Sequence, residues 1–455
     1  MKKSKTVFMV TMLVALFAAV VIILPIIFMP GDDAYAPEVV AQQPTELDLI
    51  KTLVTDPPRP QWQPPQLTRE QFLEDFDYLM TALKENVPTF GIIYRRNEVD
   101  MLALVPELRE RILDESIEWD YIPFWEMLRL DFFSHASPVG HLWLASYDTY
   151  FRSAYERFDN RRRTVYSYFG DRLANPTFDE KHLYHSQMVT PLLGFDDYNI
   201  TTNIIEDGRI AYIRLPRIYG DNWVRNPASD TLRQVDEFYS QLEGFEHLIL
   251  DMRGIYGGYT EFFTRPLIAP LIDYPLETIF HQFYMAGEYN TRLMRRAPRS
   301  MGERVPFNID DLPNIFPEVT LSEDVVNDLR LMDYYISRTV SIAPHPERRA
   351  PFNGKVWLLT DMNNFSAAQQ IAAFLHQTGF ATLVGQTTGG MVSDAALMPA
   401  FITLPNTTFE VRYDMLYIIS ADGRPWEYGT VPHHFNRDGM DALQTVLALI
   451  AEGNW

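Results

Sequence analysis

Ser366 is the residue of this sequence best placed for nucleophilic chemistry. It follows an apolar, strand-like run from Lys355 to Thr360 and a short polar turn, and it opens an apolar helical pattern that ends at Gln377. A serine at the start of a helix lies at the positive end of the helix dipole, where free backbone N–H groups can stabilise an oxyanion. Serine is also a favoured N-cap residue, so the position suits an ordinary cap as well. Whether Ser366 is a nucleophile therefore depends on the presence of a base and an oxyanion hole elsewhere in the sequence.

Glycines follow two other strand-like runs. The motif DMRGIYGG ends with Gly257 and Gly258, and the motif GQTTGG begins at Gly385. Because glycine has no Cβ, such a turn lets the backbone approach a ligand and aim N–H groups at it, which makes the first pair a candidate oxyanion hole. The alternative is that the glycines only end strands. For Asp251 and Arg253, in the same motif, a structural ion pair is the favoured interpretation.

The order of motifs along the chain resembles that of the C-terminal processing and tricorn-like serine peptidases. The sequence carries, in turn, VGHL from Val139, DMRGIYGG, SAAQ from Ser366, GQTTGG, and EYGTVP from Glu427. The resemblance spans about residues 67–450 and implies a serine peptidase that cleaves proteins or peptides through an acyl-enzyme. It also implies a core sheet of the type shared with ClpP and crotonase proteins. Departures at Val139, Ile255 and Gln369 from the family's usual residues indicate a divergent member.

The base that activates the serine is expected to be His141. One branch of the family uses a lysine about two dozen residues after the serine, but Met391 occupies that position and no lysine follows Lys355. The resemblance to the other, histidine-dependent branch assigns the role to His141. An imidazole can accept the proton of the Ser366 hydroxyl and return it later in the reaction. Alternatives are a buried structural role for His141 and catalysis by His135.

The resemblance assigns the third catalytic role to Glu427. A carboxylate next to a catalytic histidine selects its tautomer and stabilises the imidazolium. Glu410 and Asp422 are close in sequence and are the alternatives. The oxyanion hole is expected to combine the N–H of Ala367 with that of Gly257 or Gly258.

Composition excludes several other function classes. The 455 residues carry a net charge of −21 and no cysteine. This acidic balance argues against nucleic acid as a partner, because phosphate binding needs clustered Lys and Arg. Without cysteine, thiolate catalysis and disulfides are excluded. His433 and His434 are adjacent and cannot both face one ion from a regular element, so no metal or other cofactor is expected.

The N-terminus predicts a single-pass membrane anchor. Lys2, Lys3 and Lys5 precede an uncharged apolar run of 23 residues, from Val7 to Met29. About 20 residues are enough for a helix to cross the hydrocarbon core, and the lysines are expected to stay in the cytoplasm. We therefore expect an inner-membrane protein whose catalytic part faces the periplasm or exterior. Cleavage after Ala36 is the alternative.

Five segments are expected. Residues 1–29 form the anchor, 30–66 a Pro-rich tether, 67–147 an N-terminal helical domain, 148–202 an insert of uncertain structure, and 203–455 the peptidase core. A capping box at Thr68 predicts the first helix, with further helices over 101–112 and 124–130. Strands at 210–215, 247–251, 355–360 and 381–385, with helices at 230–242 and 366–377, predict an α/β fold.

A second class of function remains open from the sequence. A catalytically inactive member of the family could act as a peptide- or lipid-binding module. The high aromatic content, 13% of residues, and the Met- and Phe-rich stretch 391–415 would suit an apolar groove. Retention of the serine, histidine and glutamate set favours the enzyme, because a pure binding protein has no need of it.

Overall fold

The computed structural model describes residues 66–144, 200–215, 218, 229–297, 301–390 and 400–453. The chain divides into two compact units, Met1–Arg59 and Pro60–Trp455, and the fold below is that of the second. The predicted anchor and nearly all of the predicted tether and insert lie outside the described residues. Within those residues, no helix combines the length and apolar character needed to cross a membrane.

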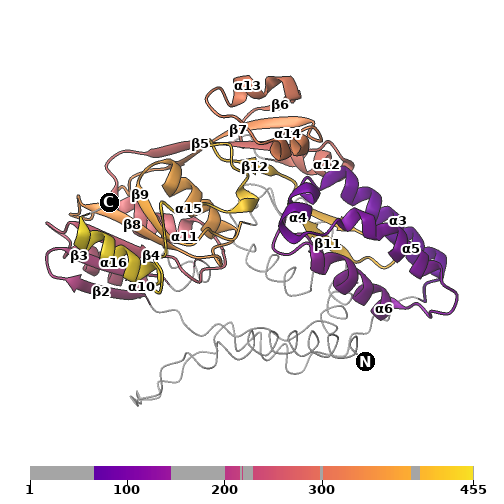
Figure 1. The fold of residues 1–455 in the computed structure, drawn as a ribbon, viewed down its shortest axis with the longest axis horizontal. Coiled ribbons are helices and arrows are strands. Elements are labelled where there is room, and N and C mark those ends of the chain that lie inside the picture. The colour runs from indigo at the N-terminus through magenta and orange to yellow at the C-terminus, as the bar shows by residue number, and fades with distance from the viewer. Residues whose placement is uncertain are drawn as a thin grey trace, which may run out of the picture. The chain divides into compact units, whose positions relative to one another are not determined.

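The centre of the unit is a six-stranded sheet with the order β13-β9-β8-β4-β3-β2 (Figure 1). Its β2–β3 pair is antiparallel and the other four pairs are parallel. In sequence order the strands are β2 Thr201–Glu206, β3 Ile210–Arg214, β4 His247–Asp251, β8 Lys355–Thr360, β9 Ala381–Gly385 and β13 His434–Phe435. All four predicted strands are confirmed, and burial on both faces of the parallel sheet explains the apolar residues 248–250 of β4 and 356–359 of β8.

Helices cover both faces of this sheet, and alternate residues of the central strands serve the two faces. Ile249 and Trp357 pack with α16 (Ala442–Glu452) on one face. Leu250 and Leu358 point the other way, into the large core shared with α10 (Asp230–Tyr239) and α15 (Ala367–Gln377). The mixed α/β fold is thus established.

The N-terminal segment is helical, as predicted. Thr68 forms a capping box with Gln71, and its helix α3 runs over Arg69–Asn86. The following elements are α4 Phe90–Asn97, η1 Met101–Leu104, α5 Val105–Leu113, α6 Tyr121–Glu126, the π-helix η2 Met127–Phe132 and η3 Phe133–His135. Three amide groups of the 406–407 turn and the Thr407 hydroxyl donate to the buried Asp75 carboxylate of α3. This contact ties the helices to the C-terminal part of the chain.

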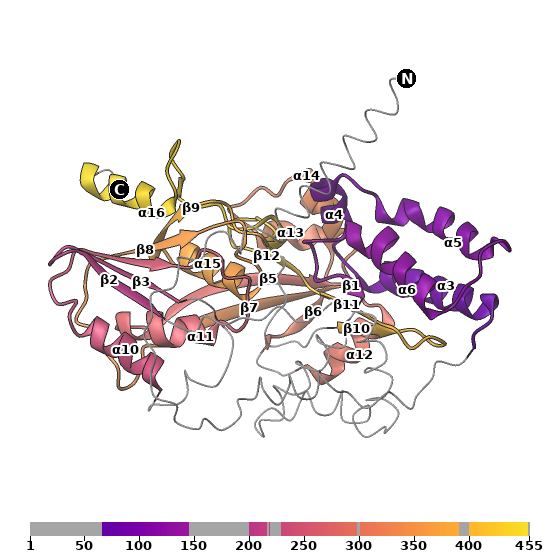
Figure 2. The same ribbon diagram turned by 90° about the horizontal axis from the view of Figure 1, so that it is seen from below.

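Two antiparallel sheets that the sequence patterns did not predict complete the unit (Figure 2). A three-stranded sheet has the order β1-β11-β10, and a four-stranded sheet has the order β12-β5-β7-β6. Their strands are β1 Trp143–Leu144, β5 Leu276–Tyr284, β6 Arg304–Pro306, β7 Tyr334–Ile342, β10 Ala400–Thr403, β11 Glu410–Tyr413 and β12 Tyr417–Ile419. The remaining elements are α11 Glu261–Phe263, η5 Thr264–Ile268, η6 Ala269–Leu271, α12 Glu288–Arg296, η8 Ile309–Asp311, α13 Leu312–Ile315, α14 Glu323–Leu329 and η9 Trp426–Tyr428.

Candidate active site

Ser366 lies in a tight turn between β8 and α15. Its backbone has φ +54° and ψ −120°, a conformation that is costly for a residue with a Cβ. The Ser366 N–H donates to the carbonyl of Gly390 at 3.0 Å, while its side chain makes no capping hydrogen bond to α15. The residue is half-buried. Its hydroxyl is therefore left free at the positive end of the helix, and it is not an ordinary cap.

Of the two candidate glycines, Gly257 is the one that packs against the serine. A Cβ added there would lie 3.0 Å from the Ser366 Cβ and 3.6 Å from its Oγ. Gly258 instead faces Ile218, with which it forms a parallel bridge, and a Cβ on it would lie 2.3 Å from the Ile218 carbonyl oxygen. Ala367 is the first residue of α15. The structure thus brings Gly257 and Ala367, but not Gly258, directly to the serine.

Asn364 holds the serine turn and the glycine turn together, and the sequence patterns did not single it out. Its buried Nδ2 donates to the carbonyls of Met252 at 2.6 Å and Ile255 at 3.3 Å, and its Oδ1 accepts from the Asp361 N–H at 2.9 Å. Asp361 in turn accepts from the N–H of Gly254 at 3.0 Å. The sequence feature that could have identified Asn364 is its place in a polar turn just before the serine, because asparagine is favoured in turns.

Asp251 and Arg253 form the structural ion pair favoured from the sequence. The Arg253 guanidinium lies 2.7 Å from the buried Asp251 carboxylate and 3.0 Å from Asp441, just before α16. The Tyr212 hydroxyl also donates to Asp251, at 2.8 Å. These contacts secure the end of β4.

His141 is 4% exposed and has a positive φ of +40°. Its Nδ1 lies 2.5 Å from Oδ2 of Asp414, a residue that the sequence patterns did not identify. The pairing of β1 with β11 sets Trp143 opposite Arg412. The rings of His141 and Trp143 lie 5.3 Å apart, and the Arg412 guanidinium lies 4.8 Å from the centre of the Trp143 ring, so the strand pairing brings these side chains together. The N–H of Asp414 also donates to the Gly140 carbonyl at 2.8 Å.

Burial lowers the pKa of His141, and the positive charge of Arg412 lowers it further. The Asp414 carboxylate acts in the opposite sense, because it stabilises an imidazolium. The net direction is downward, so His141 is neutral at neutral pH and able to accept a proton. If its Nδ1 carries the ring proton and donates to Asp414, Nε2 is the free acceptor.

Glu427 is buried in η9. Its Oε2 accepts from the backbone N–H of Gly140 at 3.3 Å. A Cβ on Gly390 would lie 2.3 Å from the Glu427 carbonyl oxygen, and Gly390 accepts the Ser366 N–H. Glu427 thus lies between the histidine turn and the serine turn.

The described structure contains no hydrogen bond between Ser366 Oγ and His141. Of the other carboxylates considered, Glu410 accepts from the Thr403 hydroxyl at 3.2 Å, and Asp422 accepts from the Arg424 N–H at 3.1 Å. Among the described residues, no group of three or more His, Asp or Glu side chains is arranged to hold a metal ion.

The comparison with family models agrees with the family that the motifs resemble. The model of peptidase family S41 matches residues 209–434. Mature CPAF complexed with lactacystin is 12% identical, with 85% of this chain and 99% of that chain covered and a TM-score of 0.49. A lipoprotein from Streptococcus agalactiae is 10% identical, with 86% of this chain and 100% of that chain covered and a TM-score of 0.41. The photosystem II D1 C-terminal processing protease is 14% identical, with 50% of this chain and 42% of that chain covered and a TM-score of 0.28.

No curated protein matches this sequence. The segment matched by the family model nevertheless holds the β4 turn with Gly257, the β8–α15 turn with Ser366, and Glu427. With these elements in the order and arrangement described above, residues 209–434 match peptidase family S41, and the chain is a serine-type peptidase.

Proposed function

We propose that this chain is a membrane-anchored, extracytoplasmic serine peptidase that cleaves proteins or peptides through an acyl-enzyme formed on Ser366. The observation that carries the proposal is the strained start of α15, where the serine hydroxyl makes no cap and the Gly257 backbone packs against it. A nucleophile held in this way faces the free N–H groups of a helix start, which suit an oxyanion.

In the proposed reaction His141 is the base and Asp414 its orienting carboxylate. His141 Nε2 takes the proton of Ser366 as Oγ bonds to the carbonyl carbon of the substrate, and it then delivers the proton to the leaving amine. Water repeats the sequence to release the acyl group. The N–H groups of Ala367 and Gly257 stabilise the oxyanion in both halves.

His141 and Ser366 must approach one another for this transfer. Catalytic hydrogen bonds are commonly long in a substrate-free enzyme and tighten only when the substrate is bound. Glu427 supports the approach, because its side chain holds the Gly140 N–H and its backbone packs on Gly390, which binds the Ser366 N–H.

The proposed location rests on the N-terminal sequence. Lysines followed by 23 uncharged residues, from Val7 to Met29, support an inner-membrane anchor with the peptidase in the periplasm or outside the cell. The parallel part of the central sheet, with α15 on one face and α16 on the other, supports a core of the ClpP/crotonase type.

Labelling of the full chain with a fluorophosphonate probe tests the proposal. We expect the wild-type protein to be labelled, and Ser366→Ala and His141→Ala variants to lose labelling while keeping their circular dichroism spectra. A folded wild-type protein that is not labelled would contradict the proposal. It would instead favour a binding module, the second function considered from the sequence.

A further inference from the structure

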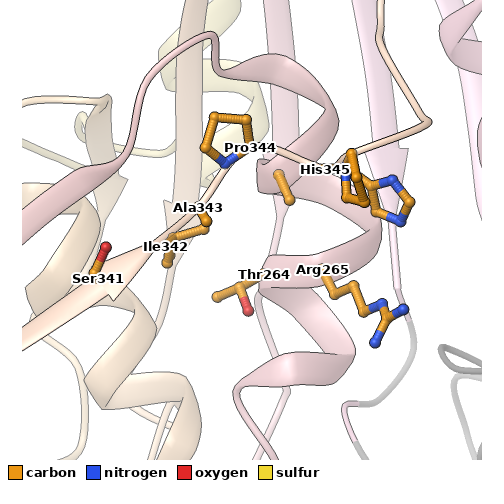
Figure 3. A pocket seen from close by; sticks show the side chains of 9 residues that line it. Thr264, Arg265, Ser341, Ile342, Ala343, Pro344 and His345 are labelled. Carbon is orange, nitrogen blue, oxygen red and sulfur yellow. The ribbon is translucent and has the colours of Figure 1, made fainter.

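A cavity of about 250 Å³ lies beside the π-helix η5 (Figure 3). The end of β7, the start of the following loop and the helical residues 264–269 form its walls. The lining residues are Thr264, Arg265, Ala269, Ser341, Ile342, Ala343, Pro344, His345 and Pro346. None of them is acidic, although the chain as a whole carries a net charge of −21.

The polar side chains of this cavity offer hydrogen-bond donors that have no partner in the described part of the chain. Arg265 is exposed, and neither a hydrogen bond nor an ion pair holds its guanidinium there. The hydroxyls of Thr264 and Ser341 are likewise not engaged by any described residue. Figure 3 shows Thr264 and Arg265 on the helix and Ser341 on the neighbouring strand.

The imidazole of His345 adds a hydrogen-bond donor, and backbone N–H groups determine which of its ring nitrogens carries the proton. Its Nδ1 lies 3.2 Å from the N–H of Glu347 and 3.0 Å from that of Arg348, and it accepts from both. Nδ1 therefore carries no proton, and the neutral ring has its N–H at Nε2. Burial and the nearby charges of Arg348 and Arg265 lower the pKa of His345, which is consistent with this neutral form.

Backbone hydrogen bonds anchor the loop that carries His345. The N–H groups of His345 and Ala350 donate to the carbonyls of Ala269 and Pro270, both at 2.9 Å. The side of the cavity that His345 lines is therefore tied to the helical residues on the other side.

We propose that this cavity is a binding site for an oxyanion group, either a carboxylate or a phosphate. Arg265 supplies the charge and a planar set of donors, and Thr264, Ser341 and His345 supply neutral donors around it. A cavity of about 250 Å³ is open enough for such a group to enter without unfolding the loop. None of the proposed catalytic residues lines this site.

Isothermal titration calorimetry on the full chain tests the site. The Ser366→Ala background prevents turnover, so that inorganic phosphate and a short glutamate-rich peptide can be titrated in separate experiments. We expect saturable binding that weakens with added salt, and a loss of about tenfold or more in affinity in Arg265→Gln. Thr264→Val, which removes one hydroxyl at nearly constant shape, should weaken binding by a smaller factor.

Arg330→Gln is the matched control, because Arg330 is an exposed arginine at the end of α14, outside the cavity, and its substitution should leave binding unchanged. Competition between the two ligands identifies the source of the oxyanion. If phosphate displaces the peptide, the site accepts peptide carboxylates, and if only phosphate binds, it is a small-anion site. Absence of binding by either ligand, or equal binding by Arg265→Gln and Arg330→Gln, would overturn the proposal.

Discussion

Asp414 Oδ2 lies 2.5 Å from Nδ1 of His141, and both side chains are buried. The contact joins two segments that are 273 positions apart, and the β1–β11 pairing brings them together. A buried carboxylate at this position fixes the orientation of the imidazole and stabilises the imidazolium. The structure therefore offers Asp414 as a direct carboxylate partner of the ring.

Replacing the carboxylates of Asp414 and Glu427 by amides, one at a time, should distinguish the roles of the two residues. We expect Asp414→Asn to lower kcat by about 10²–10⁴-fold, because the amide can force the wrong tautomer on His141. Glu427→Gln should cost less than about tenfold, since the glutamine carbonyl can still accept the Gly140 N–H. Steady-state kinetics on a peptide substrate measures both effects. A larger loss in Glu427→Gln than in Asp414→Asn would reverse the assignment.

Arg412 should control the acidic limb of the pH profile. The base must be neutral to accept a proton, so activity falls as the pH drops through the pKa of His141. Arg412 lowers that pKa, and its replacement in Arg412→Gln should therefore raise it. The acidic limb of kcat/KM should move to higher pH. The neighbouring Trp143, over whose ring the guanidinium lies at 4.8 Å, stays in place as a packing partner.

The matched control for the pH measurement is Arg330→Gln, which removes the same charge from an exposed arginine at the end of α14. Its profile should coincide with that of the wild type. A profile for Arg412→Gln that is unchanged, or that moves to lower pH, would show that Arg412 does not act on the base.

Gly257→Ala should impair catalysis through crowding at the serine. Gly257 has φ +124°, and the new Cβ would lie 3.0 Å from both the Phe365 carbonyl oxygen and the Ser366 Cβ. Displacing a nucleophile by a fraction of an ångström can cost about 10²-fold in rate. Gly208→Ala is the control, because Gly208 has φ +67° and no atom within 4 Å of its added Cβ. It should lose about 1 kcal/mol of stability and no activity.

Asn364→Ala should loosen the serine turn from the glycine turn. It removes the hydrogen bonds to the Met252 and Ile255 carbonyls, which are then left buried without this donor. We expect a loss of about 1–3 kcal/mol in the free energy of unfolding, measured by urea titration, together with a lower kcat. Asn363→Ala loses only a side-chain contact with Asp361 at 3.3 Å and should change little. Equal effects of the two substitutions would contradict the role of Asn364.

Local patterns were enough to predict four strands of the central sheet and the helices α10 and α15. Residues 356–359 of β8 are apolar because both sides of the strand are buried, and the capping box at Thr68 needs only residues three apart. These signals depend on neighbours in the chain. They also predicted Ser366 at the start of α15, where the structure places it.

The tertiary structure decided which side chains meet. No periodicity links His141 to Asp414, because their contact depends on the register of two short strands far apart in the sequence. The same holds for the choice of Gly257 over Gly258, which depends on where Ile218 pairs. The sequence by itself determined the four central strands, the family motifs and the nucleophile turn, but not the two antiparallel sheets. Long-range packing determined the partners of the base, since side-chain contacts between distant strands are set by the whole core.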